Sequence, residues 1–267
     1  MNNQPLKGKR IMVTRSVGQS AEFSDRLQKA GAKVIEMPTL EITPPSSWEK
    51  LDNAISKIAA LDWLILTSSN GVDYFFERFF IQGKKLSDLT KINIAVVGKK
   101  TAESLIAKGR EPDFIPPDFV ADSLVANFPA DLKSKKILFP RVETGGREVL
   151  VKELTEKGAE VWEIPAYDSR CPETIDPIAS DALKQGKIDI ITFASSKTVK
   201  NFYQLLTQID ENYNQNLLEN ICIASIGPQT SKTCQELFSR VDVEAKEYTM
   251  EGLYQSLVQY NLKEVSD

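Results

Sequence analysis

The chain of 267 residues carries 33 Lys and Arg against 37 Asp and Glu, a formal net charge of −4. This acidic balance argues against broad nucleic-acid binding, which needs a basic face to displace phosphate counterions. No apolar stretch is long enough to cross a bilayer, and residues 1–10 lack the apolar run of a secretory signal. We therefore expect a cytoplasmic protein that binds neither nucleic acid nor a membrane.

The sequence contains no histidine, which removes the commonest general base and the commonest metal ligand. Its three cysteines, Cys171, Cys222 and Cys234, are too few and too scattered for a disulfide framework. Cys222 and Cys234 fall in strand-like and helix-like runs, so we expect both to be buried as small hydrophobes. The spacing of cysteines and carboxylates matches no metal-ligand set.

Short apolar runs rich in β-branched residues predict buried parallel strands. In chain order they are Arg10–Val13, Trp63–Leu66, Ile92–Val97, Ile137–Phe139, Ile188–Phe193 and Ile221–Ile226. Amphipathic segments predict helices at Ala21–Ala30, Ala102–Lys108 and Val149–Lys157, which end at Gly31, Gly109 and Gly158. The aromatic run Tyr74–Phe80 has the spacing of a helix that packs on a sheet. Strands that alternate with helices predict doubly wound α/β domains with parallel sheets.

The chain resembles itself at a nearly constant offset. Residues 9–15 read like residues 135–141, and Asp62 with Ser68 and Ser69 reads like Asp189 with Ser195 and Ser196. Further on, Phe119 falls opposite Tyr248. We interpret this pattern as an internal duplication of one α/β unit.

Six loops follow the predicted strands, and all are rich in small hydroxyl residues, glycine, lysine or arginine. They are residues 14–16, 67–71, 98–101, 141–146, 194–198 and 227–230. Ligands of open parallel sheets bind at these carboxyl ends, where helix N-termini attract anions. Any single loop could be an ordinary N-cap. Together they predict a site for a polyanion.

Familiar phosphate-binding signatures are absent from the sequence: it has neither a G-x-x-x-x-G-K-[ST] loop nor a G-x-G-x-x-G fingerprint after a strand. Gly145 and Gly146 are expected to form a turn. Asp62 and Asp189 lie at the starts of their strands, the wrong end for a ligand site.

The segments 11–15, 67–72, 97–102, 137–141, 192–196 and 226–231 resemble the uroporphyrinogen-III synthase family in order and spacing. The resemblance runs from about Arg10 to Leu257. It implies two flavodoxin-like domains, with residues 1–37 and 171–267 in a discontinuous first domain and residues 44–164 in the second. Residues 38–43 and 165–170 would form a two-stranded antiparallel linker, with the substrate in the cleft between the domains.

By this resemblance, the chain is a cofactor-independent, cyclising hydro-lyase of porphyrin, tetrapyrrole and heme biosynthesis. Its substrate is hydroxymethylbilane, a linear tetrapyrrole with eight carboxylates, which the preceding pathway enzyme could deliver. The reaction loses water, inverts the last pyrrole ring through a spiro intermediate and closes the macrocycle to uroporphyrinogen III. Two domains with one cleft need no partner subunit, so we expect a monomer.

The resemblance makes Tyr167 the candidate catalytic residue, because a phenol can donate a hydrogen bond to a leaving hydroxyl. The other copy has Leu40 at the equivalent place, so packing of the repeat does not require a tyrosine. A half-exposed strand tyrosine without a catalytic role is the alternative. The candidate substrate-binding residues are Arg15, Ser68, Ser69, Asn70, Lys99, Thr101, Arg141, Ser195, Ser196, Lys197, Gln229 and Thr230. We expect Arg15 and Arg141 to pair with carboxylates, and we expect no cofactor or metal.

Two other classes remain open from the residues alone. A non-catalytic module that senses a small anion would use the same loops and would differ by the absence of turnover. A sugar- or nucleotide-processing transferase would need an Asp or Glu placed for a metal or a ribose, and the sequence places none convincingly.

Overall fold

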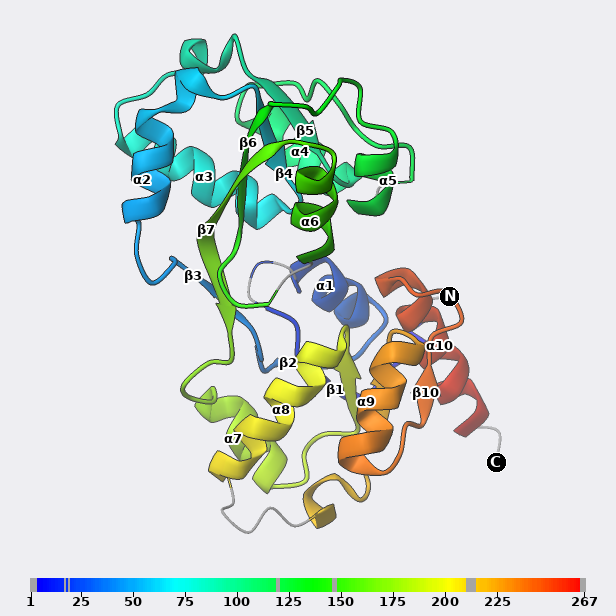
Figure 1. Cartoon of the computed structure of the whole chain (residues 1–267). Helices are drawn as coiled ribbons and strands as arrows, with labels where there is room; N and C mark the ends of the chain where they lie inside the picture. The colour runs from blue at the N-terminus through cyan, green and yellow to red at the C-terminus, as the bar shows by residue number, and fades with distance from the viewer. Residues whose placement is uncertain are drawn as a thin grey trace. The chain divides into compact units, whose positions relative to one another are not determined.

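The computed structural model describes residues 4–264 except residues 17, 19, 119–120, 146–147 and 210–214. The chain divides into two compact units, unit 1 (Met1–Glu41 with Cys171–Asp267) and unit 2 (Ile42–Arg170). Each unit is a five-stranded sheet with helices around it (Figure 1). The predicted α/β class is therefore confirmed. The predicted residues Phe119 and Gly146 lie outside the described residues.

Neighbouring strands in the sheet of unit 1 all pair in parallel, with Met12 opposite Ile191 and Ile191 opposite Ile223. Its strands, in order across the sheet, are β10 (Val243–Glu244), β9 (Cys222–Ser225), β8 (Ile190–Phe193), β1 (Arg10–Val13) and β2 (Lys33–Glu36). Because side chains alternate along a strand, β1 points Met12 to one face and Ile11 with Val13 to the other.

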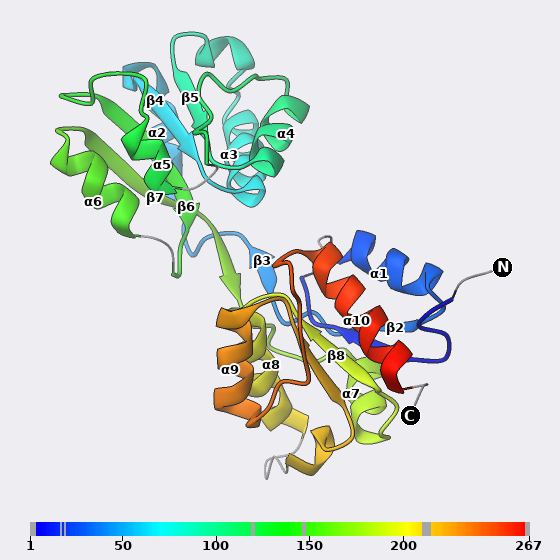
Figure 2. The same ribbon diagram turned by 90° about the vertical axis from the view of Figure 1, so that its right-hand side faces the viewer.

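Helices cover both faces of this sheet (Figure 2). The face of Met12 is packed by α7 (Pro177–Lys184), α8 (Ser196–Ile209) and α9 (Pro228–Phe238), with the short η3 (Gln215–Leu218) beside them. The opposite face is packed by α1 (Ala21–Lys29) and α10 (Met250–Glu264). Because both faces are covered, β8 and β9 are buried at every position and are built mostly from apolar residues.

The sheet of unit 2 has the strand order β3 (Glu41–Thr43), β7 (Glu160–Arg170), β6 (Lys136–Val142), β4 (Trp63–Leu66) and β5 (Asn93–Val96). Strands β5, β4, β6 and β7 pair in parallel, with Leu64 opposite both Ile94 and Leu138. The register between β6 and β7 shifts after Arg141, so Val142 pairs with Tyr167. This irregularity lies directly at the carboxyl end of the sheet.

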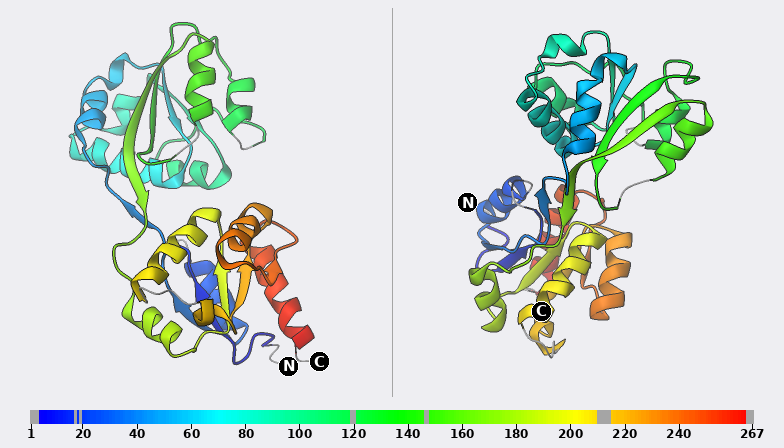
Figure 3. Two further views of the ribbon diagram at one scale, coloured as in Figure 1. Left: turned by 60° about the horizontal axis from the view of Figure 1, so that its bottom comes forward. Right: turned by 60° about the vertical axis from the view of Figure 1, so that its left-hand side comes forward.

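One face of this sheet is packed by α2 (Glu49–Ser56), α3 (Ser69–Ile81), α4 (Lys99–Ala107) and the short helices η1 (Ile58–Ala60) and η2 (Leu86–Leu89). The other face is packed by α5 (Ala121–Ala126) and α6 (Glu148–Glu156), both green in Figure 3. Phe75, Phe76 and Phe79 of α3 are fully buried against the sheet. The predicted packing role of this aromatic run is confirmed for those three side chains.

All six predicted strands are present, with ends that differ by up to three residues. Two further strands were not assigned from sequence: β2 lies at a sheet edge, and β10 has only two residues. The segment 165–170, expected as a separate linker strand, continues β7 without a break. Apolar periodicity cannot distinguish one long strand from two consecutive short ones.

The predicted helix ends at Gly31 and Gly158 are confirmed by left-handed backbone angles, with φ of +92° at both. Added Cβ atoms would lie 3.0 Å from Lys7 Cα and 3.3 Å from Lys133 Cα, respectively. Glycine is required at these two turns both for its backbone angle and for the close approach of the preceding segment. Cys222 and Cys234 are buried thiols, as predicted.

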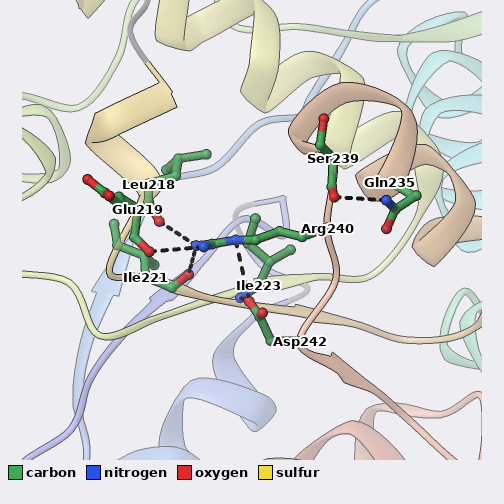
Figure 4. Close-up of polar contacts among 8 residues, drawn as sticks. All are labelled: Leu218, Glu219, Ile221, Ile223, Gln235, Ser239, Arg240 and Asp242. Atoms are coloured by element: carbon green, nitrogen blue, oxygen red, sulfur yellow. Dashed lines mark hydrogen bonds and ion pairs between the residues drawn. The ribbon is translucent and has the colours of Figure 1, made fainter.

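The amino ends of the strands are closed by carboxylates that accept backbone hydrogen bonds. Asp189 accepts from the backbone N–H of Arg10 (2.6 Å) and from its guanidinium, and Asp62 accepts from Lys136 N–H (2.9 Å). Asp242 accepts from Ile223 N–H (2.7 Å), while Arg240 binds three backbone carbonyls nearby (Figure 4). Asp62 and Asp189 therefore lie at the strand starts, as predicted, and each already has a structural partner.

In the part of the chain that the structure describes, no helix combines the length and the apolar character needed to cross a bilayer.

We predict that Asp189→Asn lowers the free energy of unfolding by about 1–3 kcal/mol at pH 7, because it removes charge-assisted hydrogen bonds to Arg10. The hydrogen bonds from Arg10 hold the pKa of Asp189 below its usual value. Its stabilisation is therefore present above the unfolded pKa of about 3.9 and is lost as the pH falls through the folded pKa. Urea unfolding at pH 7 and pH 3 should show a difference from the original chain that shrinks in acid.

The control is Asp181→Asn, which neutralises an exposed carboxylate of α7. An equal loss in both variants would mean that Asp189 acts only through net charge.

Candidate active site

At the carboxyl edge of unit 2, Ser68 and Tyr167 form a hydrogen bond between their hydroxyl groups. Ser68 is the N-cap of α3, and its Oγ accepts the backbone N–H of Gly71 at 2.9 Å. The same Oγ lies 3.0 Å from the phenol oxygen of Tyr167 on β7. Sequence reasoning selected both residues but did not predict that they touch, because they lie 99 positions apart.

Tyr167 is only 8% exposed. The alternative hypothesis of a half-exposed strand tyrosine is therefore wrong about the exposure of this side chain. Burial raises the pKa of the Tyr167 phenol, while the hydrogen bond with Ser68 and the charge of Arg141 lower it to a smaller extent. A phenol whose pKa lies above the usual value of about 10 is protonated near neutral pH. Tyr167 therefore has a hydrogen to donate.

Tyr167 is the inner member of a stack of three aromatic rings. Tyr74 of α3 lies with its ring centroid 5.9 Å from that of Tyr167, at an interplanar angle of 23°. Trp48 lies 6.3 Å beyond Tyr74 at 27°. The hydroxyl of Tyr74 donates to the backbone carbonyl of Ile42 at 3.2 Å. Sequence reasoning treated Tyr74 as a packing residue and did not consider Trp48, since nothing in their spacing points to Tyr167.

The other predicted residues of α3 and α4 differ in accessibility. Ser69 and Asn70 are the first residues of α3 and are half-buried. Thr101 is 4% exposed in the first turn of α4, which Gly98 begins with a φ of +92°. The side chain of Lys99 is 83% exposed, with Glu103 at 3.9 Å. An ion pair of this kind contributes little to stability, so Lys99 is a solvated charge in this structure.

Arg141 faces away from the Ser68–Tyr167 contact. Its guanidinium forms an ion pair with Glu163, and the Arg141 side chain is 13% exposed. The two side chains line a cavity of about 600 Å³ with Val151 and Lys152 of α6, whereas Tyr167 packs in the cluster of α3. The ion pair leaves the positive charge of Arg141 already compensated. The structure therefore brings Arg141 and Tyr167 to the same sheet edge but to different faces.

In unit 1, the starts of α8 and α9 are joined by a hydrogen bond. Ser196 Oγ donates to the backbone carbonyl of Gln229 at 2.9 Å. Ser195 and Thr198 cap α8 reciprocally, since each backbone N–H donates to the other's hydroxyl oxygen at 3.2 Å. The hydroxyl of Ser195 thus serves the helix cap. Thr230 is 4% exposed in the first turn of α9, and Lys197 is exposed.

Buried threonines join the carboxyl ends of β8, β1 and β2. Thr192 Oγ1 donates to Met12 O, Thr14 Oγ1 donates to Thr192 O at 2.8 Å, and Thr39 Oγ1 donates to Thr14 O at 2.9 Å. Asn201 of α8 donates to Thr39 O at 2.6 Å. Sequence reasoning counted Thr14 among the loop donors, whereas the structure buries it fully.

Arg15 follows this threonine ladder and is half-buried. Burial lowers the pKa of its guanidinium, and the charge of Glu22 opposes the effect. An arginine remains protonated in proteins. The end of β1 therefore carries a positive charge in a partly desolvated position, where it attracts an anion more strongly than it would in open solvent. Among the described residues, no group of three Cys, Asp or Glu side chains could hold a metal ion.

We predict that Tyr167 and Tyr74 titrate above the ordinary tyrosine value, because burial raises the pKa of both phenols. In an ultraviolet titration of the folded protein, Tyr167→Phe and Tyr74→Phe should each show one fewer tyrosine that ionises above the ordinary value. The control Tyr254→Phe, on α10, should retain both. A Tyr167→Phe variant whose titration above pH 10 matches that of the original chain would contradict the burial argument.

Comparisons with known proteins place these observations in a family. The family model described as uroporphyrinogen-III synthase HemD matches residues 21–255. A uroporphyrinogen-III synthase of Synechococcus elongatus is 52% identical over 261 residues, which cover 97% of this chain and 98% of that protein. One of Chlorobaculum parvum is 29% identical, covering 88% and 92%.

Among solved structures, the uroporphyrinogen-III synthetase of Helicobacter pylori matches with a TM-score of 0.63 at 19% identity, covering 94% of this chain and 99% of that chain. A mutant uroporphyrinogen III synthase of Thermus thermophilus matches with a TM-score of 0.61 at 18% identity, covering 96% and 100%. At these identities the two structures support the fold alone.

Proposed function

This chain belongs to the uroporphyrinogen-III synthase family, and we propose that it cyclises hydroxymethylbilane with Tyr167 as the hydrogen-bond donor to the leaving hydroxyl. The single observation that supports this role is the contact of Tyr167 with Ser68 at the N-terminus of α3. A buried, protonated phenol at the carboxyl end of a parallel sheet lies where such sheets bind their ligands.

The proposed step balances without a cofactor. The C–O bond of the terminal hydroxymethyl group breaks with its electron pair on oxygen, and the Tyr167 phenol protonates that oxygen, so water departs. The cationic carbon left behind is captured by a carbon of the last pyrrole ring to form the spiro intermediate. After rearrangement and ring closure, the proton lost from the macrocycle reprotonates the phenolate. General acids placed in this way typically contribute about 10²–10⁴-fold in rate.

The carboxylates of the substrate are proposed to bind at the helix N-termini of both sheets. Backbone N–H groups and the dipoles of α3, α4, α8 and α9 favour anions there. Arg15 supplies a partly desolvated positive charge. The proposed contacts are those predicted from sequence: Arg15, Ser68, Ser69, Asn70, Lys99, Thr101, Arg141, Ser195, Ser196, Lys197, Gln229 and Thr230. Of these, Lys99, Lys197 and Gln229 are exposed to solvent, and Arg141 would need to exchange Glu163 for a substrate carboxylate.

We also propose that the two units are duplicated copies of one α/β unit, with residues 38–43 and 165–170 as the linkers between the two domains. Strand order supports the duplication, because β9-β8-β1-β2 and β5-β4-β6-β7 follow the same sequence of repeat positions. The parallel bridge of Ala95 to Phe114 has its counterpart in Ala224 and Val243. We further propose a monomer that works in the cytoplasm, which the free thiols of Cys171, Cys222 and Cys234 suit.

The deciding experiment supplies hydroxymethylbilane in place to the purified chain and separates the oxidised products by isomer. Formation of the type III macrocycle in excess over type I, rising with protein concentration, is the expected result. If type I alone forms at every protein concentration, the proposed activity is wrong and a non-catalytic anion-binding module becomes the better interpretation.

We predict that Tyr167→Phe lowers kcat by about 100-fold, since it removes the donor to the leaving group. The same change should alter the free energy of unfolding by only about 1 kcal/mol, the usual worth of one hydrogen bond. Single-turnover kinetics and urea unfolding measure the two effects, with Tyr254→Phe as the control. A Phe variant that turns over at the original rate removes Tyr167 from the mechanism.

We predict that Arg15→Ala raises KM by about tenfold, because a charge-assisted hydrogen bond is worth about 1.5–3 kcal/mol. The increase should be larger at low salt than at high salt, since screening weakens pairing between charges. The control is Arg26→Ala, which removes the same charge from the last turn of α1, where Arg26 pairs with Glu251. An effect of Arg15→Ala that is independent of salt would argue against carboxylate pairing.

A further inference from the structure

The partners of Ser68 allow its hydroxyl to donate to Tyr167. Its Oγ already accepts the N–H of Gly71 at 2.9 Å. The same Oγ lies 3.0 Å from the phenol oxygen of Tyr167, a distance at which either hydroxyl can donate. A serine hydroxyl has one hydrogen and two acceptor lone pairs, so Ser68 can accept from Gly71 and still donate its hydrogen to Tyr167. The arrangement in which Ser68 donates therefore leaves the hydrogen of Tyr167 for a ligand.

The N-terminus of α3 favours the arrangement in which Ser68 donates to Tyr167. A hydrogen bond from the N-terminus of α3 to Ser68 Oγ polarises the Ser68 hydroxyl, because linked hydrogen bonds strengthen one another. The positive end of the helix dipole lies on the same side. Both effects stabilise negative charge on the Tyr167 oxygen. The phenol acquires that charge when it gives up its proton.

The ring of Tyr167 is held by its neighbours. Tyr74 stacks on it at 5.9 Å and is itself fixed at the far end, where its hydroxyl donates to Ile42 O. One turn earlier on the same helix, a Cβ added at Gly71 would lie 3.8 Å from Tyr167 Cε1 and 3.1 Å from Ser68 Oγ. Two successive turns of α3 therefore contact the ring and hold it in place.

We propose that Ser68 and Tyr74 are positioning residues for Tyr167: Ser68 donates to the phenol oxygen and Tyr74 holds the ring, so that the phenol hydrogen points at the leaving oxygen of the substrate. This inference rests on the proposed function of Tyr167. It changes the role of Ser68 from direct substrate binding to action through Tyr167, and it adds Tyr74, which packing alone would not single out.

The equivalent place in unit 1 differs. Ser195 corresponds to Ser68 and Thr198 to Gly71, and Ser195 exchanges its hydrogen bonds with Thr198. Leu40 stands where unit 2 has Tyr167. A serine cap at this turn therefore does not depend on a tyrosine partner. The Ser68–Tyr167 contact is a feature of unit 2 beyond its need for a helix cap.

The test is a double-mutant cycle on the full chain, with kcat and KM for type III product as the readouts. Ser68→Ala should lower kcat about tenfold with KM nearly unchanged, whereas Ser68→Thr, which keeps a hydroxyl, should restore most of the rate. In the Tyr167→Phe background, Ser68→Ala should change kcat by less than about twofold, because residues that act as one unit are not additive.

The same cycle applies to Tyr74. Tyr74→Leu should lower kcat about fivefold in the original chain and leave it nearly unchanged in the Tyr167→Phe background. Tyr74→Phe keeps the stacked ring and should stay within about twofold of the original rate. For the loss of a helix cap in Ser68→Ala, the matched control is Asp176→Ala. This variant removes the side-chain cap of α7, and Asp176 makes no contact with Ser68 or Tyr167 among its hydrogen bonds.

The outcomes separate the two proposals. If the effects of Ser68→Ala and Tyr167→Phe on kcat multiply in the cycle, Ser68 acts independently of Tyr167. The same follows if Ser68→Ala raises KM with kcat unchanged. Either result overturns the positioning role while the proposed function stands. If Tyr167→Phe is fully active, the role of Tyr167 is lost and the positioning roles with it. If the original chain forms type I product alone, both proposals fail together.

Discussion

Burial of parallel strands on both faces is the constraint from which the rest of this structure follows. Strands such as β4, β8 and β9 are buried at every position, so their side chains are apolar or, like Thr192, bonded to neighbouring groups within the protein. Polar groups available for chemistry are therefore confined to the strand ends. At the amino ends Asp62 and Asp189 are used to bind neighbouring backbone N–H groups, which leaves the carboxyl ends for ligands.

The side chains at the carboxyl ends of the two sheets have different roles. In unit 1, Thr14, Thr39 and Thr192 turn inward and bind backbone carbonyls, so the edge that carries Arg15 is held rigidly. In unit 2, the shifted register between β6 and β7 brings Tyr167 opposite Val142, beside the start of α3. A rigid binding edge and a buried phenol suit an enzyme whose task is largely to hold a flexible substrate in one folded shape.

A buried phenol that is hydrogen-bonded to a helix-capping serine can assist the departure of a leaving group in a chain that has no histidine. Desolvation keeps Tyr167 protonated, while the hydroxyl of Ser68 and the charge of Arg141 offset part of that penalty on the ionised form. The group is thus a donor in the resting protein and can still tolerate transient loss of its proton. The environment, rather than the residue type alone, makes the tyrosine useful.

Sequence reasoning predicted the α/β class, the six principal strands and the glycines that end their helices, because each depends on local periodicity or backbone angle. The amino-end positions of Asp62 and Asp189 followed from the same strand assignments. Exposure was harder to predict: Tyr167 is buried where a half-exposed residue was one alternative, and the side chain of Lys99, predicted to bind substrate, is exposed to solvent.

What the sequence alone determined about this protein is its alternation of strands and helices and the ends of its principal strands, since both are properties of short segments. Only the tertiary structure decided which side chains meet there. The pairing of Ser68 with Tyr167, the stacking of Tyr74 and the turn of Arg141 toward Glu163 each join residues from separate strands and helices. Such contacts depend on register and on the face of the sheet, because a single-residue shift in a strand reverses the direction of every side chain.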